Sequence, residues 1–160
     1  MKNWIAPLIF LLFATGTLQA QNGNSISDFD DLMYHLKKGE SIQAVLHYAK
    51  CDLYVDSIKQ ERAINAIGGM PIEVYEYFGK NLFGNEHAFI STSETKLIEN
   101  PLGEGYVYNY VKIKIYDNNQ VEIFARYLNP KTYEETMSEK FAGQIHSKEN
   151  DGGVFLYSKQ

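Results

Sequence analysis

Apolar and polar residues alternate through much of this chain, which is typical of strands that bury one face. The alternation is clearest over residues 106–116 and returns over 121–128, with Asp-Asn-Asn-Gln between the two segments. In the first segment one face is mostly aliphatic: Val107, Asn109, Val111, Ile113, Ile115. The opposite face carries tyrosines and lysines: Tyr106, Tyr108, Tyr110, Lys112, Lys114, Tyr116. This pattern predicts a β-hairpin with one buried aliphatic face.

A helical period precedes these strands. Apolar residues recur at i, i+3, i+4 and i+7: Phe29, Leu32, Met33, Leu36. Ser27 and Asp30 have the spacing of a capping box at the start of a helix. Two lysines followed by Gly39 are a typical helix end. We therefore expect a helix between Ser27 and Gly39.

The rest of the chain predicts further short strands and no division into parts. Strands are expected over 41–51, over 70–78, from 87 toward 98, as a pair within 132–145, and finally through Tyr157. Residues 52–67 fit either a helical turn or a long loop. The expected fold is a single α+β domain over residues 21–160, in which an N-terminal helix is followed by a curved antiparallel β-sheet or a small β-barrel.

The first twenty residues have the pattern of a secretory signal peptide. Lys2 precedes an apolar run of about a dozen residues, shorter than the roughly 20 that a membrane-spanning helix needs. Cleavage is expected after Ala20, with an uncleaved membrane anchor as the alternative. The sequence thus predicts an exported protein, secreted or, in a bacterial host, periplasmic, with no stable membrane anchor after cleavage.

Charge and cysteine content exclude several classes of protein. The net charge of −5 argues against a nucleic-acid binder, which needs a basic stripe to neutralise phosphates. A single cysteine, Cys51, excludes a disulfide framework and a thiolate zinc site. We expect Cys51 to be buried as a small apolar residue, the alternative being a reactive or intermolecular thiol.

The tyrosine-rich strand is the most distinctive candidate for binding. Tyr106, Tyr108 and Tyr110 share one side of it, and Arg126 on the returning strand could reach the same region. Aromatic rings with a few cations suit a glycan, a small apolar ligand or a protein surface. The alternative is structural, because tyrosines favour strands and can simply coat an outer face.

Histidines offer a second, catalytic hypothesis. His47 and His87 with nearby acids could form the site of a secreted hydrolase or a metal-dependent enzyme, but no histidine pair has the tight spacing of a metal-binding motif. His47 and Cys51, four apart on a strand, would lie about 13 Å apart, beyond hydrogen-bonding reach. No catalytic residue, metal ligand or cofactor is therefore predicted.

The layout of the chain resembles the VirK family of small exported proteins. The resemblance rests on the helix with the segment that follows it and on three later segments: 29–32 through 38–39, 45–51, 72–78, 88–93, 126–130. It spans nearly the whole chain after residue 20, but it implies no established activity, cofactor or site. The expected function is a non-enzymatic binding or interaction module, a monomer or weak dimer, with assembly into a structural or matrix protein as a further alternative.

Overall fold

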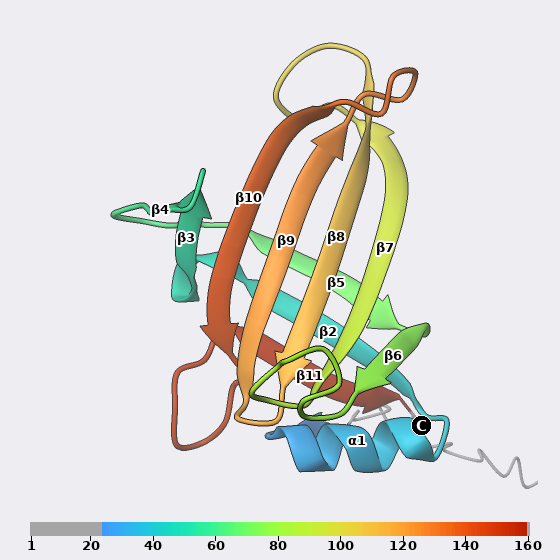
Figure 1. The fold of residues 1–160 in the computed structure, drawn as a ribbon. Coiled ribbons are helices and arrows are strands. Elements are labelled where there is room, and N and C mark those ends of the chain that lie inside the picture. Colours follow the sequence, from blue (N-terminus) through green and yellow to red (C-terminus); the bar gives the residue numbers. More distant parts are fainter. Residues whose placement is uncertain (1–23, 160) are drawn as a thin grey trace, which may run out of the picture.

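The computed structural model describes residues 24–159, and within them strands account for most of the regular structure (Figure 1). The elements in chain order are β1 Asn24–Ile26, α1 Phe29–Lys37, β2 Ser41–His47, the 3₁₀ helix Tyr48–Lys50, β3 Asp52–Val55, β4 Ile58–Lys59, β5 Ile67–Ile72, β6 Tyr75–Phe78, β7 Phe89–Glu99, β8 Tyr106–Tyr116, β9 Gln120–Leu128, β10 Glu135–Gln144 and β11 Val154–Lys159.

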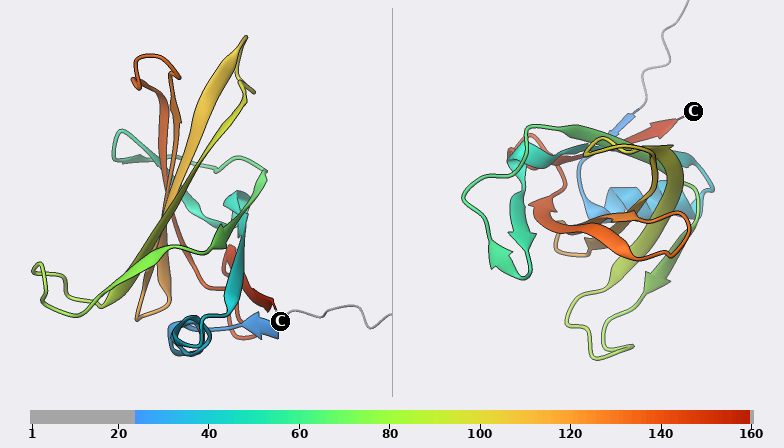
Figure 2. Two further views of the ribbon diagram at one scale, coloured as in Figure 1. Left: turned by 90° about the vertical axis from the view of Figure 1, so that its right-hand side faces the viewer. Right: turned by 90° about the horizontal axis from the view of Figure 1, so that it is seen from above.

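The strands form two antiparallel sheets that face each other (Figures 1 and 2). The small sheet has the order β1-β11-β2-β5, and the large sheet has the order β4-β3-β10-β9-β8-β7-β6. Helix α1 lies at one end of this pair, and the large sheet extends well beyond the small sheet at the other end (Figure 2). Neither sheet closes on itself, so the predicted mostly antiparallel class is confirmed and the alternative of a small barrel is wrong.

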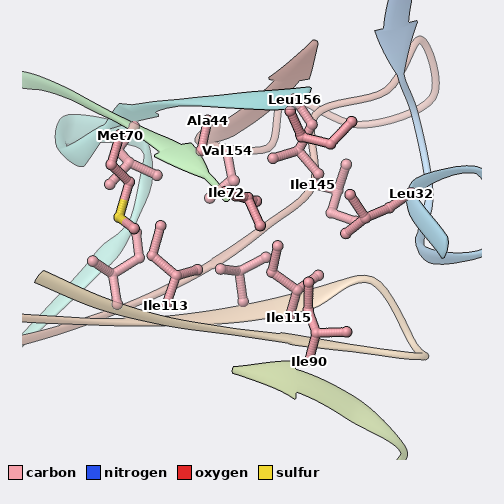
Figure 3. Close-up of a cluster of buried hydrophobic side chains, with 14 of the residues drawn as sticks. Leu32, Ala44, Met70, Ile72, Ile90, Ile113, Ile115, Ile145, Val154 and Leu156 are labelled. Atoms are coloured by element: carbon pink, nitrogen blue, oxygen red, sulfur yellow. The ribbon is translucent and has the colours of Figure 1, made fainter. Parts of the chain in front are cut away.

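The core lies between the two sheets (Figure 3). Ile72 and Leu156 of the small sheet face Ile113 and Ile115 of the large sheet, and none of the four is more than 2% exposed. Leu32 of α1 is fully buried at the same core. The aliphatic face predicted for the hairpin is therefore the surface on which the small sheet packs.

The segment predicted as one strand over 70–78 is two strands in different sheets. β5 ends at Ile72, paired with Ile42 in the small sheet, and β6 begins at Tyr75, paired with Thr92 in the large sheet. Between them the chain crosses from one sheet to the other, and Thr92 Oγ1 donates a hydrogen bond of 2.7 Å to the carbonyl of Val74. The sequence pattern placed Val74 on the same side as Ile72, but Val74 is 78% exposed and Tyr75 packs against the core, so the buried side shifts by one residue at the crossing.

Four local predictions also need correction. The helix cap is Asp28, whose carboxylate accepts a hydrogen bond of 2.8 Å from the Asp31 N–H, and not Ser27. β1 precedes α1, so the expected order of a helix first and the sheet afterwards is not what the structure shows. The strand expected over 41–51 ends at His47, because the 3₁₀ helix Tyr48–Lys50 follows it. The segment 132–145 holds one long strand, β10, and not a pair of short ones.

The large sheet has stretches with a neighbour on only one side. β6 pairs with β7 only over residues 89–92, and β3 pairs with β10 only over 140–142. Within the described residues, 93–99 of β7 and 135–139 of β10 therefore have one neighbouring strand each.

Cys51 is buried at the junction of the two sheets, which confirms its predicted burial. A Cβ at Gly143 or Gly153 would approach its Sγ to 2.7 or 2.6 Å, so both glycines make room for the sulfur. Burial, and secondarily the nearby Asp52, raises the pKa of the thiol. The predicted signal peptide lies outside the described residues, and within these no helix is long and apolar enough to cross a membrane.

Candidate binding face

One face of the large sheet packs on the small sheet, and the opposite face, which we call the outer face, is not covered by a second sheet (Figures 1 and 2). Directly opposed residues of antiparallel strands project to the same side. The register of β8 with β9 opposes Lys114 to Glu122, Lys112 to Phe124, Tyr110 to Arg126 and Tyr108 to Leu128. These four pairs form consecutive rows across the outer face.

Phe124 lies at the centre of the outer face with a lysine on each neighbouring strand. Lys112 Nζ of β8 lies 4.5 Å from the centroid of the Phe124 ring, and Lys140 Nζ of β10 lies 5.6 Å from it. Both distances fall within the range of cation–π contact, which is worth about 0.5–1 kcal/mol at exposed sites. The ring therefore holds two ammonium groups over the middle of the sheet.

Two lysines of the outer face form no ion pair within the described residues, although Lys114 lies opposite Glu122 and helps to lower the pKa of that carboxyl. Arg126 pairs with Glu135 at 2.9 Å, and Lys140 pairs with Glu122. By contrast, no carboxylate lies within 4.0 Å of the ammonium groups of Lys112 and Lys114 anywhere in residues 24–159. Because the chain as a whole carries −5, these lysines are a local excess of positive charge on an acidic protein.

The four residues predicted to bind a ligand all lie on or beside the outer face, but they do not form one cluster. Tyr110 and Arg126 are cross-strand neighbours, so the structure brings these two together. Tyr108, one row further, stacks on Tyr133 with ring planes 2° apart and centroids 6.0 Å apart. Tyr106 lies at the far end of β8 and is 65% exposed.

Sequence reasoning missed Phe124, Lys140 and the Tyr133 ring. The alternation over 121–128 was the signal for Phe124, since it puts this ring on the side opposite to Ile123. No local signal placed Lys140, because its position depends on the pairing of β10 with β9. A shallow pocket of about 470 Å³ opens beside Phe124, between the outer face and the β3–β4 turn, and Arg126 and Ser57 are among its lining residues.

Glu122 on the outer face interacts with Lys140 of β10 and with Tyr116 at the end of β8. It accepts a hydrogen bond of 2.7 Å from the hydroxyl of Tyr116 and a second from Lys140. Burial acts to raise the pKa of Glu122, but the hydrogen bonds from Lys140 and Tyr116 outweigh it and lower the pKa below its ordinary value of 4.5. Burial and the hydrogen bond to this carboxylate raise the pKa of Tyr116.

Glu122→Gln is expected to remove an acid-sensitive part of the protein's stability. A carboxylate whose pKa is lower in the folded than in the unfolded state stabilises the fold above its unfolded pKa and loses that effect as pH falls through the folded pKa. The difference in melting temperature between wild type and Glu122→Gln should therefore be largest near neutral pH and shrink below pH 4.5. Differential scanning fluorimetry across pH measures it.

The matched control is Glu104→Gln, because Glu104 is exposed and forms no ion pair within the described residues. Its melting temperature should follow that of the wild type at every pH. A Glu122→Gln difference that stays constant down to pH values well below 4.5 would contradict the assignment.

The two histidines of the catalytic hypothesis, His47 and His87, contact different residues. His47 packs against Phe155 with centroids 4.7 Å apart, and His146 stacks on the same ring at 4.0 Å. His87 shares a hydrogen bond of 2.7 Å between its Nδ1 and Asp117. In residues 24–159 no group of three histidine, cysteine, aspartate or glutamate side chains is placed to hold a metal ion.

The fold and this face define a two-sheet antiparallel β-protein with one short helix and an exposed basic and aromatic surface. The chain belongs to the VirK family: the family profile described as VirK protein matches residues 25–133, which confirms the resemblance drawn from the sequence. Among solved structures the chain is similar to lpg1832, a VirK family protein from Legionella pneumophila, with a TM-score of 0.62, 16% identity, and coverage of 83% of this chain and 98% of that one. No curated protein matches the chain.

Proposed function

We propose that this protein is an exported, non-enzymatic binding module whose outer face binds an acidic partner. The observation that carries the proposal is the pair Lys112 and Lys114, which project from β8 with no carboxylate within 4.0 Å of either ammonium group in the described residues. Export is supported by the signal-peptide pattern of residues 1–20, with the mature chain beginning at Gln21.

The geometry favours charge recognition over stacking of a flat ligand. Phe124 is approached by Lys112 and Lys140, and Tyr108 stacks on Tyr133, so these two rings already make contacts within the protein. Lys140 is already paired with Glu122, whereas the ammonium group of Lys112 above the same ring forms no ion pair within the described residues. An ammonium near an aromatic ring keeps its donors for an anion while its alkyl chain packs on the sheet.

The position of the lysines adds a geometric argument. Lys112 and Lys114 are two residues apart on one strand and so lie roughly 7 Å from each other on the same side. Arg126 and Tyr110 occupy the next row, with a guanidinium and a hydroxyl as further donors. A partner with regularly spaced carboxylates or sulfates can engage several of these groups at once.

The test is the double variant Lys112→Gln/Lys114→Gln, with heparin and poly-L-glutamate as the acidic probes. We expect the wild type to bind at least one probe at low salt and the variant to bind it about tenfold more weakly, equivalent to about 1.4 kcal/mol. The slope of log affinity against log salt should fall by about 1 for each lysine that contacts the probe. Isothermal titration calorimetry at several salt concentrations gives both quantities.

The matched control removes the same charge elsewhere: Lys37→Gln/Lys148→Gln, on α1 and on the β10–β11 connection. This control should retain wild-type affinity, because binding at the outer face depends on where the lysines lie and not only on the net charge of the protein. Equal losses in both double variants would show a general charge effect and contradict the proposal, as would a wild type that binds neither probe.

A further inference from the structure

A polar groove of about 700 Å³ crosses the end of the outer face nearest α1. Its floor is formed by the adjoining ends of β8, β9 and β10, through Tyr116, Gln120, Glu122, Ala142 and Gln144. One wall is His87 of the β6–β7 connection; the opposite wall includes Lys50 and Asp151. The volume lies in the range of small-molecule sites, about 300–1,000 Å³.

The charges that line this groove are neutralised within the protein. Asp151 pairs with Lys50, Asp52 pairs with Lys59 at 2.8 Å, and Glu122 pairs with Lys140. Every carboxylate on the groove thus has a lysine beside it. The groove offers hydrogen-bonding groups without an uncompensated charge, in contrast to the region around Lys112, which does not line it.

Two carboxamides in the groove remain available to a ligand. Gln120 and Gln144 are directly opposed across β9 and β10, both are exposed, and neither side chain forms a hydrogen bond within residues 24–159. Each carboxamide can donate two hydrogen bonds and accept others. His87 uses its Nδ1 toward Asp117, so its Nε2 is the ring nitrogen left for a ligand.

We infer that this groove binds a neutral saccharide. A ligand for it must be polar, uncharged and rich in groups that both donate and accept hydrogen bonds, and sugar hydroxyls have these properties. The ring of Tyr116 adds an apolar surface of the kind on which a pyranose face packs. Ala142 is a small residue on the floor between the two walls, so its side chain takes up little of the groove. This site is independent of the proposed acidic partner.

The experiment is a titration of ¹⁵N-labelled residues 21–160 with maltotetraose, cellotetraose and chitotetraose, followed by NMR chemical shifts. We expect at least one of these oligosaccharides to shift the amide signals of β9 and β10 around Gln120 and Gln144, at concentrations up to the millimolar range. Since the groove is neutral overall, the affinity should not change with salt, whereas binding of heparin to the lysines should fall steeply.

Variants then locate the site. Gln120→Ala/Gln144→Ala should weaken the saccharide at least tenfold, and Ala142→Phe, which raises the floor, should abolish its binding. Gln60→Ala, directly after β4 and not among the residues that line the groove, is the control and should bind as the wild type does. Thermal melting confirms that each variant is folded.

Two results would overturn the inference. One is the absence of any shift in the groove with all three oligosaccharides; the other is a wild-type affinity in the folded Ala142→Phe variant. Either result leaves the acidic-partner proposal standing, because the heparin titration of Lys112→Gln/Lys114→Gln decides that one separately.

Discussion

Truncating Phe141 to alanine is expected to destabilise the protein by about 3–5 kcal/mol. Phe141 is 1% exposed and lies on β10, opposed to Ile123 of β9 and to Leu53 of β3. Its ring also contacts that of Tyr48, with centroids 4.6 Å apart. Removing the ring would leave a cavity where three strands and the 3₁₀ helix meet, and the β-sheet backbone around it can collapse only in part.

Urea unfolding followed by far-UV circular dichroism measures this loss. Phe83→Ala makes the same chemical change at a side chain that is 75% exposed, in the β6–β7 connection, and should cost less than about 0.5 kcal/mol. Comparable midpoints for the two variants would mean that Phe141 does not hold the junction of the sheets.

Gly152→Ala is the second substitution expected to have a large effect, a loss of about 1–3 kcal/mol or more. A Cβ at this position would lie 2.5 Å from the carbonyl oxygen of Gln144 and 2.7 Å from that of Ile145. Both atoms belong to the backbone and cannot turn aside as a side chain can. The end of β10 and the start of β11 would have to move apart.

Gly79→Ala is the control for this substitution, because a Cβ at Gly79 meets nothing within 4 Å and the residue does not have a positive φ. That variant should be neutral or slightly more stable, by about 0.4–1 kcal/mol, since alanine restricts the unfolded chain. If Gly152→Ala unfolds at the same urea concentration as Gly79→Ala, close backbone approach is not the reason for a glycine at 152.

The hairpin was predictable because its information is local. Eleven alternating residues gave β8 the bounds Tyr106–Tyr116 that the structure shows, and the polar turn fixed the register of β9 against it. That register is also what put Arg126 beside Tyr110, so this part of the candidate face followed from the sequence. Alternation over a full strand leaves one register that buries the aliphatic side.

The rest of the candidate face depends on contacts between distant segments. Lys140 reaches the Phe124 ring only because β10 pairs with β9, and the sequence around residue 140 does not indicate which strand is its partner. The groove has the same origin: Gln120 and Gln144 are 24 positions apart and become neighbours through that pairing. The crossing between β5 and β6 could not be predicted for a related reason. Side chains alternate between two faces in the strands of either sheet, so alternation does not indicate which sheet a strand joins.

The half-paired stretches of β7 and β10 bear on how this protein behaves at high concentration. An open strand edge is a template on which another chain can add. Glu135 and Glu139 lie at the two ends of the β10 stretch, 135–139, and charged side chains on an edge strand oppose the addition of another strand. The irregular register at Glu135 and Met137 further breaks the regular edge. This edge therefore carries features that oppose the addition of a second copy of the chain.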